Sequence, residues 1–166
     1  DAVLAFAANA VVIRTSWVYA SHGTNFLRTM LRLAETRDEI GVVGDQLGRP
    51  TWAKDLASAA LSAAVRARQG DPAARGVFHY CGAGDATWAD FAEAIFERAT
   101  KRSRRGSRVR RITTAEYPTP AKRPLNSRLD TEKIKRSLGV VARDWREATN
   151  LCLDELLNLS LIHISE

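Results

Sequence analysis

Short β-branched runs alternate along this chain with longer segments that carry apolar residues at helical spacing. The runs expected to form strands are 11–14, 41–44, 76–82 and 110–114. The segments expected to form helices are 25–38, 56–68, 87–100, 131–139 and one that opens at Asp144. This alternation predicts an α/β fold, in which helices cover a largely parallel sheet. A chain of 166 residues, 45% of them apolar, is long enough to bury a substantial core.

Local signals mark where several of these helices start and stop. Thr87 is a natural N-cap, and Asp90 three residues later completes a variant of the capping box. Gly139 is free to take the left-handed conformation that ends the helix begun by Thr131. The stripe that follows Asp144 is expected to end near Leu157.

The two ends of the chain are expected to differ from a natural protein. The chain opens on Asp1 without an initiator methionine, so we expect sequence to precede it. Residues 158–166 are apolar and break the helical stripe, which is typical of sequence read through from outside the natural protein. No run approaches the roughly 18 apolar residues of a membrane span, so we expect no membrane contact.

The net charge of +6 comes from one place. Residues 101–111 carry seven basic side chains and no acidic one, whereas the rest of the chain has 18 basic and 19 acidic residues. A nucleic-acid-binding module is one reading of this basic run. A solvated surface loop is favoured, because no aromatic residues alternate with the charges and the remainder is near neutral.

The sequence contains almost none of the common enzyme motifs. The glycines of 41–48 lack the spacing of a phosphate-binding loop and do not lead directly into a helix. His79 lies inside an expected strand, where a packed core residue is favoured over a ligand. Cys81 and Cys152 stand apart in apolar segments, which indicates two reduced, buried thiols in a cytosolic protein.

Three segments are polar and aromatic where a plain core would not be: 14–19, 45–51 and 117–130. The first follows a strand and should lie at its carboxyl end, where ligands bind in open α/β sheets. The third holds Lys122, Arg123 and Asn126 in a proline-rich loop of low conformational entropy, which suits a phosphate contact. Each segment also has a purely structural interpretation. These are a strand edge for 14–19, an ordinary turn for 45–51 and a surface linker for 117–130.

Taken together, these motifs resemble the dTDP-4-dehydrorhamnose reductase family. The resemblance rests on Arg-Thr-Ser-Trp-Val-Tyr at 14–19, Gly-Thr-Asn-Phe at 23–26, Asp-Gln-Leu-Gly-Arg-Pro-Thr at 45–51, Thr-Trp-Ala-Asp at 87–90 and the run 117–130. Order and spacing hold from about residue 1 to residue 157. The resemblance implies the C-terminal part of a Rossmann-type fold of the extended short-chain dehydrogenase/reductase class, with its small substrate-binding domain. Residues 1–20 would end the dinucleotide-binding sheet and 21–157 would form the substrate-binding region with the remaining strands.

The family reduces the 4-keto group of dTDP-4-dehydro-L-rhamnose to give dTDP-L-rhamnose for cell-wall polysaccharides. The resemblance implies NAD(P)H as cofactor, allows Mg²⁺, and implies a cytoplasmic homodimer of the full-length protein. The family's glycine-rich loop and Tyr-x-x-x-Lys pair lie upstream of the Arg-Thr-Ser-Trp segment, and this chain has neither. We therefore expect no catalytic residues here and no reductase activity from this half alone. A non-catalytic regulatory subunit of the same fold is the open alternative.

Six side chains are the expected substrate contacts. The resemblance places Trp17 at the sugar pocket. Chemistry adds amides for sugar hydroxyls or base edges and guanidinium groups for the pyrophosphate. These additional candidates are Asn25, Gln46, Arg49, Arg123 and Asn126. No cofactor-binding residue can be named from the sequence.

Overall fold

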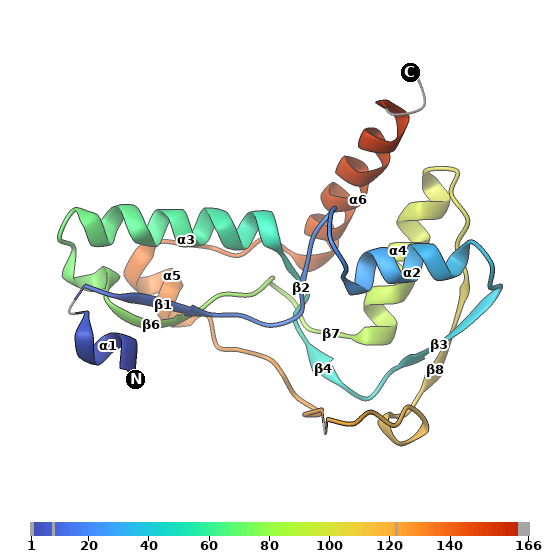
Figure 1. Ribbon diagram of the computed structural model, residues 1–166, viewed down its shortest axis with the longest axis horizontal. Coiled ribbons are helices and arrows are strands. Elements are labelled where there is room, and N and C mark those ends of the chain that lie inside the picture. The colour runs from blue at the N-terminus through green and yellow to red at the C-terminus, as the bar shows by residue number, and fades with distance from the viewer. Residues whose placement is uncertain (1, 8, 122, 163–166) are drawn as a thin grey trace.

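The computed structural model describes residues 2–7, 9–121 and 123–162 (Figure 1). Its α-helices are α1 (Ala2–Phe6), α2 (Phe26–Ala34), α3 (Ala53–Arg68), α4 (Trp88–Lys101), α5 (Glu132–Leu138) and α6 (Trp145–Ile162). Two short 3₁₀ helices are η1 (Pro72–Ala74) and η2 (Thr114–Glu116). The strands are β1 (Val11–Arg14), β2 (Val18–Tyr19), β3 (Glu39–Val43), β4 (Leu47–Gly48), β5 (Thr51–Trp52), β6 (Gly76–His79), β7 (Ala86–Thr87) and β8 (Arg108–Ile112).

The four expected strands are present, and they pair two by two. β1 runs parallel to β6, with Val11 opposite Gly76 and Arg14 opposite His79. β3 runs parallel to β8, with Glu39 opposite Arg108. Between these pairs lie two short ladders, parallel β2–β5 and antiparallel β4–β7. The α/β class predicted from the alternation is confirmed.

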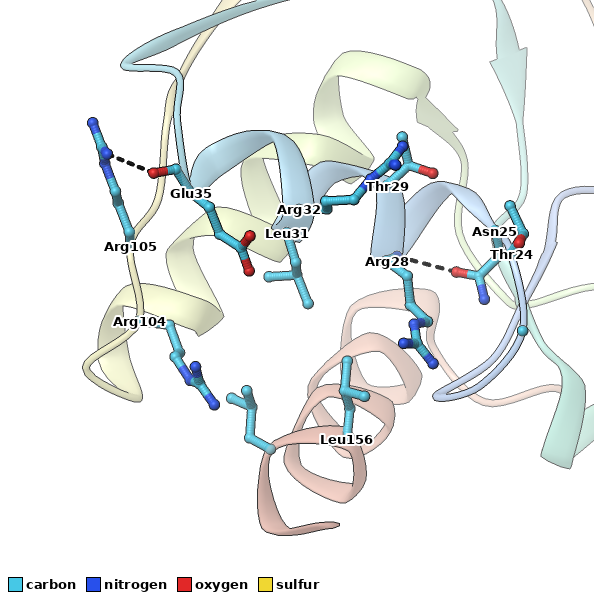
Figure 2. Close-up of a pocket in the computed structure, with 12 residues that line it drawn as sticks. Thr24, Asn25, Arg28, Thr29, Leu31, Arg32, Glu35, Arg104, Arg105 and Leu156 are labelled. Atoms are coloured by element: carbon cyan, nitrogen blue, oxygen red, sulfur yellow. Dashed lines mark hydrogen bonds between the residues drawn. The ribbon is translucent and has the colours of Figure 1, made fainter. Parts of the chain in front are cut away.

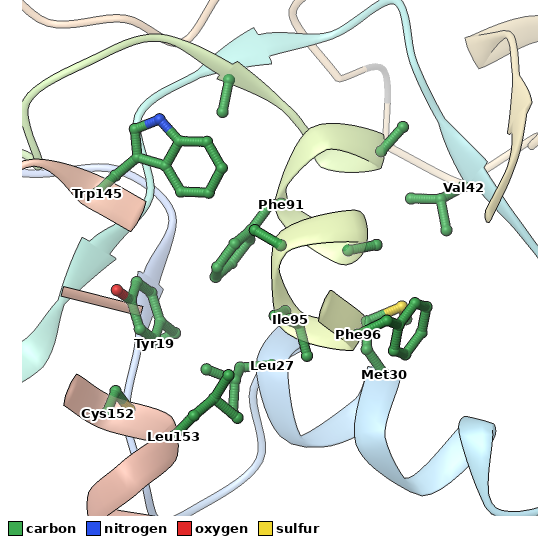
Figure 3. Packing of buried hydrophobic residues seen from close by; sticks show 14 of the residues in the cluster. Tyr19, Leu27, Met30, Val42, Phe91, Ile95, Phe96, Trp145, Cys152 and Leu153 are labelled. Carbon is green, nitrogen blue, oxygen red and sulfur yellow. The ribbon is translucent and has the colours of Figure 1, made fainter. Parts of the chain in front are cut away.

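Buried apolar residues form two clusters. The main core lies among α2, α4, α6 and β3, and Figure 3 shows Phe91 and Ile95 of α4 facing Leu27 of α2 and Leu153 of α6. The second core packs α3 and α5 against the β1–β6 pair. In Figure 1 the β1–β6 pair with α3 and α5 stands at one end of the molecule, and α2, α4, β3 and β8 at the other.

The helix signals predicted at Thr87, Gly139 and Asp144 are confirmed, whereas the Thr131 side chain forms no capping hydrogen bond at the start of α5. The Thr87 side chain accepts from the Asp90 backbone N–H at 3.1 Å, and an Asp90 carboxylate oxygen accepts from the Thr87 N–H at 2.7 Å. Gly139 has φ 65°, the left-handed cap that a glycine adopts without steric cost. Asp144 Oδ1 accepts from the backbone N–H groups of Arg146 and Glu147, so it caps α6 as expected.

Several boundaries differ from the prediction. Helix α2 ends at Ala34 rather than Asp38, because the polar residues after it add nothing to the buried stripe. Strand β8 begins at Arg108, so the basic run is a loop only between the last turn of α4 and that strand. Helix α6 continues to Ile162, so the expected end at Leu157 was wrong. The non-native origin of 158–166 stays a prediction, and 163–166 lie outside the described residues.

The histidine and cysteine expectations had different outcomes. His79 is only half-buried, and its Nδ1 lies 3.2 Å from the Asp130 carbonyl oxygen. The core position is taken by Phe78, because neighbouring side chains on a strand point to opposite faces. Cys81 and Cys152 are free and buried, as predicted. Burial raises the pKa of the Cys152 thiol to about 12, so it stays protonated at neutral pH. Within the described residues, no helix is both long and apolar enough to cross a bilayer.

Candidate functional site

The three polar segments singled out in the sequence converge at the carboxyl ends of β1 and β6. The Thr51 backbone N–H donates to the Trp17 carbonyl at 3.1 Å, joining the first segment to the second. The Leu47 N–H donates to the Leu125 carbonyl and the Ser127 N–H donates to the Leu47 carbonyl, both at 2.8 Å. These bonds join the second segment to the third, so residues about 80 positions apart in the sequence lie side by side.

Trp17 occupies the centre of this junction in an unusual conformation. Its φ is 49°, a left-handed backbone that costs a non-glycine residue about 1–2 kcal/mol. Its half-buried indole stacks on Trp88, with ring centroids 3.7 Å apart and an interplanar angle of 13°. Gly48 also lies against the ring, since a Cβ at that position would fall 2.2 Å from Trp17 Cε2. Backbone strain that neighbours hold in place is common at functional sites.

Gln46 is buried rather than open to a ligand. Its Nε2 donates to Thr114 Oγ1 at 3.1 Å. The Thr114 hydroxyl and backbone N–H in turn donate to the Asp45 carboxylate, at 2.7 Å and about 3 Å, and these bonds lower the pKa of Asp45. The amide of Gln46 therefore fastens the 45–51 loop to the start of η2.

Arg49 and Asn126 belong to one polar network. The Asp85 carboxylate accepts from Arg49 Nε at 2.8 Å and from Arg128 Nη1 at 2.7 Å. The bond from Arg128, followed by that from Arg49, holds the pKa of Asp85 below its usual value. Arg49 Nη1 also donates to the Leu129 carbonyl at 3.1 Å, and Asn126 Oδ1 accepts from the backbone N–H and Nε of Arg128. Two guanidinium groups thus share the Asp85 carboxylate.

A cavity of about 420 Å³ opens beside this network. Its lining joins two of the six expected contacts to the start of α5. The lining residues are Arg49, Asn126, Arg128, Leu129, Asp130, Thr131 and Glu132.

Asn25 and Arg123 take no part in the hydrogen bonds that form this junction. Asn25 is the N-cap of α2, where its Oδ1 accepts from the Arg28 N–H and its Nδ2 donates to the carbonyls of Ala20 and His22. Its amide therefore satisfies the backbone at this turn. Arg123 is exposed in the proline-rich segment, and none of the described residues forms a hydrogen bond or ion pair with its side chain. Lys122, which was expected to flank it, lies outside the described residues.

A larger cavity of about 780 Å³ lies between α2, the loop before β8 and α6 (Figure 2). Arg28 and Arg104 point into it from opposite sides, and Leu31 and Leu156 contribute apolar surface. Asn25 stands on its rim and is the only one of the six expected contacts among its lining residues. Of the six expected contacts, Asn25 thus lines the larger cavity, and Arg49 and Asn126 line the smaller one.

The structure adds three side chains that sequence reasoning did not single out. Thr15 Oγ1 and Ser16 Oγ are buried and have no hydrogen-bond partner among the described residues. A buried hydroxyl without a partner is costly, so these two groups favour a polar ligand at the strand end. The sequence signal for such a role was that Thr15 and Ser16 directly precede Trp17. Trp88 was named only within the Thr-Trp-Ala-Asp motif at 87–90 and not as a site residue, although it contacts Trp17 directly.

The structure gives no support for the Mg²⁺ that the family resemblance allows. Within residues 2–7, 9–121 and 123–162, no group of three or more His, Cys, Asp or Glu side chains is placed to hold a metal ion.

Comparison with known proteins identifies the family to which the chain belongs. The family model described as the RmlD substrate binding domain matches residues 1–158. A dTDP-4-dehydrorhamnose reductase from Sinorhizobium fredii is 45% identical over 150 residues, which are 90% of this chain and 51% of that protein. The chain thus spans about half the length of the curated relatives it matches.

Solved structures show the same relation. A dTDP-4-dehydrorhamnose reductase from Clostridium acetobutylicum superposes with a TM-score of 0.79 at 35% identity, covering 89% of this chain and 49% of that one. The Bacillus anthracis enzyme, solved in complex with NADP, gives a TM-score of 0.77 at 31% identity over 87% of this chain and 48% of that one. The expected placement in the extended short-chain dehydrogenase/reductase class is confirmed. Because the family match covers nearly every residue, and the segments that carry it meet around Trp17, this chain is a member of the RmlD substrate binding domain family.

Proposed function

We propose that this chain is the sugar-nucleotide-binding half of a dTDP-4-dehydrorhamnose reductase, which reduces dTDP-4-dehydro-L-rhamnose to dTDP-L-rhamnose. The observation that carries the proposal is the meeting of segments 14–19, 45–51 and 117–130 around Trp17. An aromatic ring, two unpartnered hydroxyls and an Arg-rich network at one strand end suit a ligand with both a sugar ring and phosphates.

The chemistry divides between this half and the half that would precede it. A nicotinamide cofactor, when bound, supplies the hydride that reduces the 4-keto carbon. The buried hydroxyls of Thr15 and Ser16 suit a contact with this cofactor at the end of β1, because each hydroxyl can donate and accept hydrogen bonds. Trp17 packs against the sugar, and Gln46 holds the 45–51 loop in place. The proton donor for the new alkoxide would be the tyrosine expected upstream.

Two arginines are candidates for the pyrophosphate. Arg123 is the first, since prolines restrict the backbone around it and presenting its guanidinium costs little entropy. Arg49 is the second, because it lines the 420 Å³ cavity. Asp85 partly neutralises Arg49, so a phosphate there would compete with an existing ion pair.

Binding measurements on a full-length reductase that carries this half separate these roles. Arg123→Ala should weaken dTDP-sugar and dTDP together by about ten- to a hundred-fold, because both ligands carry the pyrophosphate. Trp17→Ala should weaken the dTDP-sugar alone. Arg49→Ala, measured in parallel, tests the second candidate. If Arg123→Ala leaves dTDP affinity intact, the proline-rich segment is a structural strap and Arg49 takes the phosphate.

Of the two alternative functions, nucleic-acid binding is disfavoured, whereas a regulatory subunit stays open. Most of the basic run is paired with carboxylates, for example Arg102 with Asp154 and Arg111 with Glu93, which supports a surface role over nucleic-acid binding. A regulatory subunit differs from an enzyme in the Tyr and Lys expected upstream, so reading the codons before Asp1 decides that point.

A cytoplasmic location and a homodimeric full-length protein are further parts of the proposal. Fractionation of cells that express the full-length protein tests the location. Sedimentation equilibrium of the purified protein tests the dimer, and a concentration-independent monomer would refute it.

A further inference from the structure

We propose that Trp88 is a positioning residue for the sugar contact, acting by holding the Trp17 indole in one plane. The inference rests on the proposed function only for the claim that Trp17 touches the sugar. The stacked pair, with centroids 3.7 Å apart and rings 13° from parallel, is the observation behind it.

Trp88 is itself firmly placed. It is the first residue of α4, directly after the Thr87 cap, and the reciprocal bonds between Thr87 and Asp90 fix that turn. The preceding strand β7 pairs with β4, which sets Ala86 opposite Gly48. The backbone that carries Trp88 is therefore tied directly to the glycine that lies against the Trp17 ring.

An aromatic series connects this position to the main core. The Phe26 ring lies 4.7 Å from the Trp88 ring and 5.3 Å from Phe91, centroid to centroid. Phe91 is fully buried and also contacts Tyr19, whose ring centroid lies 5.0 Å away. The rings of Phe91 and Phe26 therefore connect the buried core to the half-exposed ring of Trp88 and restrict its movement.

Trp17 needs this support because its own backbone does not favour the observed conformation. A left-handed φ persists in a bulky residue only when its surroundings enforce it. The Thr51 N–H holds the Trp17 carbonyl, but only Trp88 and Gly48 constrain the plane of the ring among the contacts described above. Without Trp88 the indole gains rotamers, and a sugar must then bind a ring that is not pre-oriented.

The test is a double-mutant cycle in the full-length reductase, with titration of dTDP-L-rhamnose and dTDP. Trp88→Leu should weaken dTDP-L-rhamnose by about three- to ten-fold and leave dTDP within two-fold. Trp88→Phe keeps a flat ring and should restore most of the affinity. The Trp17→Ala/Trp88→Leu double variant should bind no more weakly than Trp17→Ala, since both changes remove one shared contact.

Trp145→Leu is the matched control. Trp145 is buried in the same core, 6.0 Å from Phe91, and makes no ring contact with Trp17 among the described residues. It should lower the melting temperature without a selective loss of the sugar ligand. An equal loss of dTDP-L-rhamnose affinity in Trp145→Leu, additive effects in the cycle, or full affinity in Trp88→Leu would each overturn the positioning role. If Trp17→Ala itself has no effect, the sugar contact in the proposed function fails instead.

Discussion

Gly48→Ala tests the close approach between this glycine and the Trp17 ring. An added Cβ would lie 2.2, 2.5 and 2.7 Å from Cε2, Cζ2 and Cδ2 of Trp17, whereas ordinary contacts begin near 3.4 Å. The ring must therefore retreat by more than about 1 Å. The backbone of Gly48 is not left-handed, so the clash with the ring is the dominant effect of the substitution.

The cost follows from two terms. Forcing an extra methyl group into a packed position typically costs about 1–3 kcal/mol. Displacing the ring also weakens its stack on Trp88, and an aromatic pair is worth about 0.5–1.5 kcal/mol. We expect Gly48→Ala to lower the free energy of unfolding by about 2–4 kcal/mol. Equilibrium urea unfolding followed by far-UV circular dichroism measures this loss without relying on tryptophan emission.

Two further variants make the reasoning refutable. Gly44→Ala adds the same methyl group in the same loop, but its nearest neighbour is Arg111 Cβ at 3.4 Å, so a change within about 0.5 kcal/mol is expected. In a Trp17→Ala background, Gly48→Ala should be nearly neutral, because the ring that blocks the methyl group is gone. A loss of the same size in both backgrounds would show that Trp17 does not set the requirement for glycine.

Three other predictions concern activity, charge and pH. The purified 166-residue chain should oxidise no nicotinamide cofactor in the presence of dTDP-4-dehydrorhamnose, and measurable oxidation would contradict the assignment of catalysis to the upstream half. Replacing Arg104, Arg105 and Arg108 by Ser in the full-length protein should leave the substrate KM nearly unchanged, because these side chains are exposed and lie apart from the Arg49 network; a large rise would place them at the nucleotide. The bond from Arg98 lowers the pKa of Asp154, so this carboxylate stabilises the fold above its unfolded pKa and loses that effect as pH falls through its folded pKa. Asp154→Asn should therefore be less stable than the parent at pH 7, with the difference shrinking below about pH 4 in urea titrations.

Local signals predicted the elements of this fold better than their pairing. The Thr87 capping box and the Gly139 cap are settled within a few residues, so the sequence was sufficient for them. The pairing of 11–14 with 76–79 depends on α3 and α5 packing against both strands, and no local pattern encodes that. The sequence pattern of one strand does not show which other strand packs beside it on the same core.

In the candidate site, too, features with a local sequence signal were predicted better than those that depend on tertiary packing. Trp17 was identified from a motif, and the structure places it at the junction of all three polar segments. Asn25 was expected to bind ligand because of its amide, yet an asparagine before an apolar helical stripe is also a preferred N-cap, and the structure shows that use. Trp88 was not predicted as a site residue, because a tryptophan at the start of a helix is explained equally well as a core residue. Whether any of the six expected residues contacts substrate stays a prediction.

The separation of the two cores has a consequence for amide hydrogen exchange. The second core rests on a two-stranded parallel sheet whose strand β1 is only half-buried, whereas the main core buries several aromatic rings. Amide protons of β1 and β6 should therefore exchange through a smaller opening free energy than those of α4. Trp17 lies on the chain between them, with Ile13 packed on the second core and Tyr19 buried in the main one. A ligand seated on that ring would hold both ends of this connection, so it should slow exchange in β1 as well as beside the site.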